Sequence, residues 1–368
     1  MIIDAHSHLV TPLSLLGIRT GLEVSGGQHS LKWLEAMLPK ADLDAALDKT
    51  LRIMDEVGTD LQIVSPRPFT LMHSHHRMED IQIWVRLQND LIHRNVEKHP
   101  TRFRGMAALP QMNGAPIETT FDELDRCIDQ LGFVGILLNP DPAEGKGNGP
   151  HLGEPYWNPL WEKLAEMDVP ALIHSAGCCG RETYDEHFAT EESMAITKLA
   201  HTDIFDRFPG LKIIVSHGGG AIPYQIGRWR SHWLMSQAAE QPHIAAYFRE
   251  LEDAAKGGRP FPERPDDLVT FDHVLRKFYF DTDVHDATSM QLLFEKVGVA
   301  RCLFGTERPG SGGGLDLRTG RPMDDLKYTI DHIPSLTPAD RRALYQDNAL
   351  KVFSRIPRAL VEDRLDHG

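Results

Sequence analysis

The sequence is poor in cysteine and in long apolar runs, and these two shortages exclude whole classes of protein. Its 368 residues include four cysteines, and no two of them form a CxxC pair, so a disulfide framework is not expected. No stretch approaches the roughly 18 apolar residues that a membrane helix needs. The first residues also lack the basic and then apolar pattern of a signal peptide. We therefore expect a protein of the reducing cytoplasm.

Basic residues are in short supply as well. The chain has 39 lysines and arginines against 53 aspartates and glutamates, which gives a formal net charge of −14. A protein that binds nucleic acid or an anionic membrane surface needs a dense basic field, so neither partner is expected. An anionic small-molecule substrate remains possible, because a few local arginines can outweigh the global charge inside a cleft. The 19 histidines stand out, since imidazole is both a metal ligand and a proton carrier near neutral pH.

Eight short apolar runs alternate with stretches of helical periodicity. The runs are residues 2–6, 61–65, 103–109, 134–138, 171–174, 212–217, 278–281 and 301–305. Most are nearly continuous in apolarity, which is typical of strands buried on both faces. Helical spacing of apolar residues occurs in residues 42–57, 81–96, 121–131, 155–167, 194–208 and 287–297. This alternation predicts an α/β fold of the TIM-like (β/α)8 barrel type, with a doubly wound parallel sheet as the alternative.

Two segments are too long for ordinary loops. Residues 9–41 follow the first run, and residues 231–272 separate the sixth run from the seventh. We expect a single barrel domain over residues 1–368 with these two segments as insertions, placed near the active-site rim or at a subunit contact.

The strongest chemical signal lies where the predicted strands end. His6 and His8 end the first run, and residues i and i+2 of a strand project to the same side. His174, His217 and Glu307 end or closely follow the fifth, sixth and eighth runs. In a barrel these five side chains gather at the C-terminal mouth, where such enzymes keep their chemistry. Three or four histidine and carboxylate ligands with an open position are typical of a catalytic metal site.

The other motifs are weaker evidence for a chemical function. The triple glycine 218–220 matches neither nucleotide-binding pattern, so we expect it to permit close backbone approach beside His217. The glycine-rich segment 310–314 is expected to be a mobile loop. The adjacent Cys178 and Cys179 have no paired base in view, which favours a structural or pocket-wall role over a nucleophile.

Arginines decide the class of substrate. Arg67 follows the second run between two prolines, Arg308 follows Glu307 directly, and Arg228 lies on the helical stretch after the triple glycine. A single arginine is more often a surface salt-bridge partner, but several that converge on a metal site would bind carboxylates. We predict that Arg67, Arg228 and Arg308 bind substrate. His76, in a histidine cluster after the second run, is either solvated or a further substrate contact at the rim.

The chain resembles the amidohydrolase superfamily, in the branch of aminocarboxymuconate-semialdehyde decarboxylase and its relatives. The matching segments are residues 3–8, 102–105, 131–135, 173–174, 217–221, 227–228, 279–282 and 303–306. The resemblance implies one divalent metal, usually Zn²⁺ with Mn²⁺ as the alternative, bound by His6, His8 and His174. It also implies that His217 is the acid or base beside the metal. Arginines that match Arg228 can be offered across a subunit interface, so a homodimer or higher homo-oligomer is expected.

One departure from that branch sharpens the function. The decarboxylases usually carry aspartate in this part of strand eight, whereas this chain has Glu307. Glutamate followed by a glycine-rich loop resembles the 4-oxalomesaconate hydratases of bacterial protocatechuate and gallate breakdown. We therefore expect a metal-dependent hydratase, a lyase, in which Glu307 is both metal ligand and base. Glu307 or His217 would take the proton of the water that adds to a conjugated alkene, and His217 would protonate the neighbouring carbon. The alternatives are a non-oxidative decarboxylase of an aromatic or muconate-type acid and a metal-dependent lactone or amide hydrolase.

Overall fold

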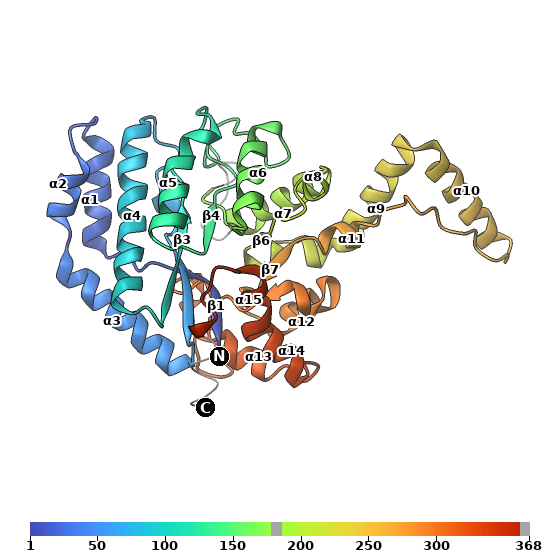
Figure 1. Ribbon diagram of the computed structural model, residues 1–368. Helices are drawn as coiled ribbons and strands as arrows, with labels where there is room; N and C mark the ends of the chain where they lie inside the picture. Colours follow the sequence, from blue (N-terminus) through green and yellow to red (C-terminus); the bar gives the residue numbers. More distant parts are fainter. Residues whose placement is uncertain (178–185, 361–368) are drawn as a thin grey trace.

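The computed structural model of the protein describes residues 1–177 and 186–360. Its centre is a sheet of eight parallel strands that pair in sequence order (Figure 1). They are β1 (Ile3–His8), β2 (Leu61–Ser65), β3 (Phe103–Ala108), β4 (Gly135–Leu138), β5 (Ala171–Ile173), β6 (Ile213–Val215), β7 (Tyr279–Asp281) and β8 (Cys302–Leu303). The end of the sheet returns to β1, where the Ala5 N–H donates to the Phe304 carbonyl (2.8 Å) and the His8 N–H to the Arg308 carbonyl (2.7 Å). The predicted barrel is confirmed, and the doubly wound alternative is wrong.

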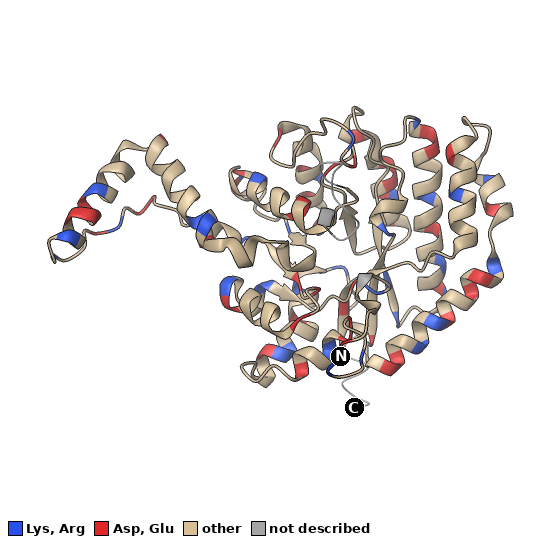
Figure 2. Ribbon diagram, turned by 180° about the vertical axis from the view of Figure 1, so that it is seen from behind, with Lys and Arg blue, Asp and Glu red and all other residues tan. Residues whose placement is uncertain are grey.

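Helices cover the outside of this barrel (Figure 1). In the described residues they are α1 (Leu13–Val24), α2 (Leu31–Met37), α3 (Lys40–Val57), α4 (Met78–Lys98), α5 (Phe121–Asp125), α6 (Asn158–Met167), α7 (Glu186–Ala200), α8 (Ile204–Arg207), α9 (Ile222–Glu240), α10 (Pro242–Lys256), α11 (Phe271–Leu275), α12 (Ala287–Val297), α13 (Leu326–Asp331), α14 (Pro338–Arg342) and α15 (Asn348–Val352). Acidic and basic residues are interspersed along α3 (Figure 2). Within the described residues, no helix is both long enough and apolar enough to cross a membrane.

The helix ends follow from local side-chain chemistry. Asp286 caps the N-terminus of α12, because its carboxylate accepts a hydrogen bond from the Ser289 N–H (2.8 Å). Thr337 and Asp340 form a capping box that begins α14. Gly58 ends α3 at a φ of 79°, a left-handed conformation that glycine adopts at little cost.

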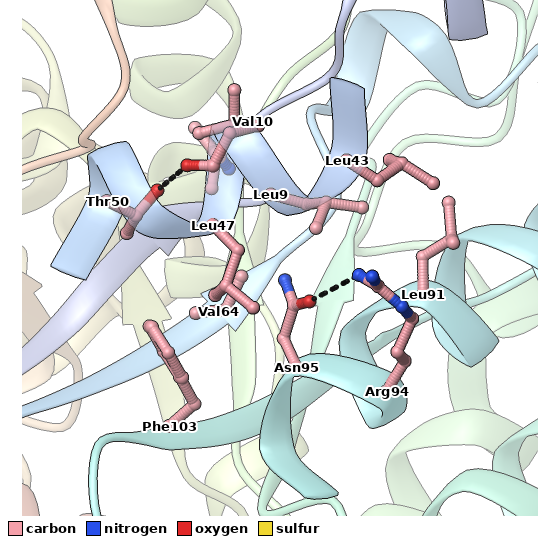
Figure 3. Close-up of a pocket in the computed structure, with 12 residues that line it drawn as sticks. Leu9, Val10, Leu43, Leu47, Thr50, Val64, Leu91, Arg94, Asn95 and Phe103 are labelled. Carbon is pink, nitrogen blue, oxygen red and sulfur yellow. Dashed lines mark hydrogen bonds between the residues drawn. The ribbon is translucent and has the colours of Figure 1, made fainter. Parts of the chain in front are cut away.

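The outer face of β1–β3 is sealed by α3 and α4. Figure 3 shows Leu43 and Leu47 of α3, Leu91 of α4, and Val64 and Phe103 of the strands around one small pocket. The space left among these side chains is a cavity of about 20 Å³, which has room for a single water molecule and not for a substrate. This region is therefore a packing interface.

The two predicted insertions take different forms. Residues 9–41 contain α1 and α2, which lie beside α4 on the barrel wall (Figure 1). In the second segment, the outer part of α9, all of α10 and the extended return to α11 form an arm, residues 231–270, that projects away from the barrel (Figure 1). Trp233 Nε1 donates to the Val269 carbonyl at the base of the arm (2.7 Å). Whether the arm forms a subunit contact stays a prediction.

Candidate metal centre and active site

The five strand-end residues meet at one point of the barrel mouth. His8 Nε2 lies 3.3 Å from His174 Nε2, and Glu307 Oε1 lies 4.0 Å from the first of these nitrogens and 3.9 Å from the second. The His6 ring is centred 5.0 Å from each of those two imidazoles, and His217 Nε2 lies 3.7 Å from Glu307 Oε1. All but His217 are at most 3% exposed. The cluster predicted from the strand ends is thus present as a buried group.

His6, His8 and His174 are each oriented by a hydrogen bond at Nδ1. His6 Nδ1 donates to Asp281 Oδ2 (2.6 Å), and His8 Nδ1 donates to Ser65 Oγ (3.1 Å). His174 Nδ1 donates to the carbonyl of the next residue (3.0 Å). The carboxylate and the carbonyl can only accept, and Ser65 Oγ donates its own proton to the Ser7 carbonyl (3.3 Å). We therefore assign the proton of each neutral ring to Nδ1, which leaves the Nε2 lone pair for the centre of the cluster.

This arrangement fits a divalent cation. Burial lowers the pKa of His174 to about 3 and that of His8 well below its ordinary value, so these rings are neutral. Two Nε2 lone pairs 3.3 Å apart repel each other unless a positive charge lies between them. His6 Nε2 is buried and has no hydrogen-bond partner among the described residues. Burial opposes ionisation of Glu307, yet its contacts with His174 and His217 hold its pKa well below the ordinary range. Imidazole nitrogens with a carboxylate are ordinary ligands of Zn²⁺ and similar cations.

Asp281 is a functional residue that the sequence analysis did not single out. It ends β7, is fully buried, and its second oxygen accepts from the backbone N–H groups of Gly218 (3.0 Å) and Asp283 (3.1 Å). It thereby connects His6 to the ends of β6 and β7. The signal that revealed the histidines was available here too, since a polar residue ends the seventh apolar run.

A second acid–histidine pair lies beside Glu307. Asp283 is at most 3% exposed, with Oδ1 3.1 Å from His285 Nε2 and Oδ2 3.6 Å from His217 Nε2. Burial, reinforced by the charge of Glu307, raises the pKa of Asp283 well above its ordinary value. Gly312 packs on His285 so closely that an added Cβ would lie 2.3 Å from the ring. Part of the glycine-rich segment therefore covers this pair, and its mobility stays a prediction. The sequence analysis missed both residues of the pair.

Glu307 is held in place by a network behind the strand ends. Asp4 accepts from the Thr306 N–H (3.1 Å), from Thr306 Oγ1 (2.6 Å) and from Gln62 Nε2 (3.2 Å), and burial raises its pKa to about 6. Glu307 itself has a φ of 57°, which is uncommon for a residue with a side chain. An added Cβ at Gly310 would lie 2.3 Å from Glu307 Oε2, so only glycine fits there.

His217 stands on a turn that needs its glycines. Its φ is 50°, and positive φ values follow at Gly218, Gly219 and Gly220. A Cβ at Gly220 would lie 2.3 Å from the Ala189 carbonyl, and one at Gly219 would lie 2.7 Å from the Phe280 ring. The predicted close backbone approach beside His217 is confirmed.

The four predicted substrate-binding residues have different surroundings. Arg67 Nη2 donates to the Pro309 carbonyl, and its charge helps to lower the pKa of His8. Arg308 Nη2 donates to Asp324 (2.6 Å), and Arg308 lines a cavity of about 620 Å³ next to α3 that none of the five clustered side chains lines. Arg228 and His76 are exposed. The structure thus places Arg67 beside the cluster, and the substrate role of all four stays a prediction.

Cys178 and Cys179 lie outside the described residues.

Another histidine after β2, His73, is buried and bonded on both ring nitrogens, to the Leu109 carbonyl and to Asn139 Nδ2 (both 3.0 Å). Its role is structural.

Comparison with known proteins agrees with this geometry. The chain is 32% identical to the 2-keto-4-carboxy-3-hexenedioate hydratase of Sphingobium sp. (strain NBRC 103272 / SYK-6) over 84% of this chain and 83% of the relative. The crystal structure of 4-oxalomesaconate hydratase from Rhodopseudomonas palustris is 31% identical and superposes with a TM-score of 0.77, over 100% of this chain and 99% of that one. A dihydroxybenzoic acid decarboxylase from Polaromonas sp. JS666, solved with bound manganese, shares the fold at 22% identity and a TM-score of 0.67, over 98% of each chain. The amidohydrolase family profile matches residues 3–355, and the chain belongs to this family.

Proposed function

We propose that the protein is a metal-dependent hydratase, a hydro-lyase that adds water to the C=C bond of an unsaturated oxo-tricarboxylate such as 4-oxalomesaconate. The observation that carries this proposal is the position of Glu307, whose carboxylate lies between the His8–His174 pair and His217. A glutamate there reaches both the metal ligands and a second acid–base residue. The two hydratases among the relatives support the same reaction class.

The metal in this proposal is a single divalent cation held by His6, His8, His174 and Glu307. We propose Zn²⁺, which suits three imidazoles and a carboxylate, with Mn²⁺ as the alternative because the Polaromonas decarboxylase of the same fold was solved with manganese. When bound, such a cation supplies Lewis-acid charge that makes water more acidic and polarises a carbonyl.

The chain's own residues then divide the proton transfers. One of Glu307 and His217, whose Oε1 and Nε2 atoms lie 3.7 Å apart, accepts a proton from the attacking water. His217 donates a proton to the neighbouring alkene carbon. When Glu307 is the base, it passes the proton of the water on to His217, so both residues end in their starting states and one water is added with no net oxidation or reduction. Arg67 lies beside His8 and pairs with a carboxylate of the substrate.

We also propose that two copies of the chain pair through α9. Arg228 and Tyr224 lie one helical turn apart on this helix, and Tyr224 is 79% exposed. Arginine and aromatic side chains are enriched at the centres of protein–protein interfaces. We therefore propose that this exposed pair enters the substrate-binding cleft of the partner subunit. Arg228→Met should raise KM about 10-fold with little change in kcat, as expected when uniform substrate binding is lost. If Arg228→Met leaves KM unchanged in a protein that sediments as a dimer, the arginine is not offered to substrate.

The reaction is tested with 4-oxalomesaconate and purified protein loaded with Zn²⁺ or Mn²⁺. We expect the absorbance of the conjugated alkene to disappear without release of CO₂, and the product to contain one added water by mass. Release of CO₂ from this substrate or from a panel of hydroxybenzoates would instead support a decarboxylase. Turnover of lactones or amides alone would support a hydrolase.

A further inference from the structure

Glu192 is the buried acid nearest to His217 on the side away from Glu307. It comes from α7, is fully buried, and places both carboxylate oxygens near His217 Nδ1, at 2.8 and 2.9 Å. We propose that Glu192 is the positioning residue of the reaction, which keeps the proton on His217 Nδ1 and turns Nε2 toward Glu307.

The first reason is the hydrogen-bond geometry. A carboxylate that accepts a hydrogen bond from Nδ1–H with both of its oxygens excludes the tautomer in which Nδ1 carries no proton. The opposite nitrogen, Nε2, is buried without a hydrogen-bond partner among the described residues and lies 3.7 Å from Glu307 Oε1 and 3.6 Å from Asp283 Oδ2. Glu192 therefore decides which nitrogen faces the reacting groups.

The second reason is that α7 and the His217 turn are fitted to each other. Ser193 Oγ accepts from the Ala221 N–H (2.9 Å), and Gly220 passes so close to Ala189 that a side chain there is excluded. The ring of Phe188, also on α7, stacks on the His217 ring with 5.3 Å between centroids and 27° between planes. The ring is thus held on its face by Phe188 and on its edge by Glu192. This support also offsets the strain of a histidine at a φ of 50°.

The chemistry of the pair supplies a third reason. Burial raises the pKa of Glu192 to about 7, against the pull of His217. A carboxylate paired with histidine through Nδ1 supports an imidazole that gives and takes protons through Nε2.

The kinetic part of the test rests on the proposed hydratase activity. Glu192→Gln keeps an acceptor for Nδ1–H but removes the charge, and Glu192→Leu removes both. We expect kcat to fall about 10- to 100-fold in the first variant and further in the second, with KM changed by less than about twofold. Lys198→Gln, at an exposed position of the same helix, is the control and should leave kcat unchanged. In a His217→Asn background, Glu192→Gln should have almost no additional effect, because the two residues act as one unit.

The structural part of the test does not depend on activity. Protein without metal, labelled with ¹⁵N in histidine, reports the tautomer of His217 through long-range ¹H–¹⁵N correlations, with His217→Asn used to identify the signal. We expect Nδ1–H in the wild type and a mixture of tautomers in Glu192→Leu, with the thermal midpoint measured to confirm folding. An unchanged tautomer in Glu192→Leu, or an unchanged kcat in Glu192→Gln, would overturn the assignment of Glu192. Wild-type protein that shows the Nδ1–H tautomer and its loss in Glu192→Leu, but hydrates no substrate, would instead overturn the proposed function alone.

Discussion

The barrel mouth and the arm differ in how their side chains are held. At the mouth, His6 and His8 each donate through Nδ1 to a residue from a different strand, and these groups are almost fully buried. In the arm, Met235 and Phe261 are 68% and 67% exposed. Polar bonds in the mouth orient lone pairs toward one point, whereas those in the arm hold an extended segment against a helix.

This difference predicts how far the effect of a substitution extends in each region. A buried polar group that loses its partner has no water to replace it, so a single change at the mouth disturbs the whole cluster. An exposed group in the arm finds water, so changes there should stay local. The predictions below test this contrast, beginning with the mouth.

The largest effect is expected at a metal ligand. His174→Ala removes one of the two imidazoles whose Nε2 atoms lie 3.3 Å apart. We expect the bound metal to be lost and kcat/KM to fall by at least about 10³-fold, as metal analysis and turnover assays will measure. His201→Ala is the matched control, because His201 is exposed and bonded only to the Thr197 carbonyl among the described residues (2.7 Å). Full metal content and activity in His174→Ala would show that the metal site has been assigned to the wrong residues.

The next effect concerns the length of the Glu307 side chain. Glu307→Asp withdraws the carboxylate by one methylene from His217 Nε2, which lies 3.7 Å away in the wild type. We expect kcat to fall about 10²- to 10³-fold, the range for loss of a general acid or base, while metal content is largely retained. Glu307→Gln separates the role of charge from that of length. If the Glu307→Asp variant hydrates 4-oxalomesaconate at the wild-type rate, the proposed function loses its main support.

A smaller effect is expected at Asp281, which accepts a hydrogen bond from the proposed metal ligand His6. Asp281→Asn keeps the oxygen that accepts from the Gly218 N–H but removes the charge that orients His6. We expect metal affinity, measured by competition with a chelator, to weaken about 10- to 100-fold. Asp272→Asn, which removes the ion-pair partner of Arg230 outside the mouth, is the control. Equal affinities in the two variants would mean that the partner of His6 contributes nothing to the site.

The mouth also shows what sequence reasoning can and cannot reach. His6, His8, His174 and Glu307 were predictable because strand period and strand ends place them at one edge of a barrel. The role of Glu192 was not predictable, because it lies within a helix. A single acidic residue there gives no sign in the sequence of whether it is buried or exposed. Asp283 and His285 depend on the path of the chain after β7, which no periodic pattern describes. The arm was predictable as an insertion by its length, but its direction depends on contacts such as that of Trp233 with Val269.

The smallest effect is expected at the base of the arm, and it tests whether the two regions are independent. Gln237 is paired in both directions with Val269, donating to its carbonyl (2.6 Å) and accepting from its N–H (3.2 Å). Gln237→Ala removes two hydrogen bonds and should lower the free energy of local opening by about 1–2 kcal/mol. Hydrogen exchange or limited proteolysis of residues 231–270 would report this, and Ser236→Ala, one residue earlier on α9, is the control. Because the arm opens without exposing the barrel core, kcat and the main thermal transition should stay unchanged. A parallel loss of activity in Gln237→Ala would mean that the arm supports the mouth, and the contrast between the two regions would fail.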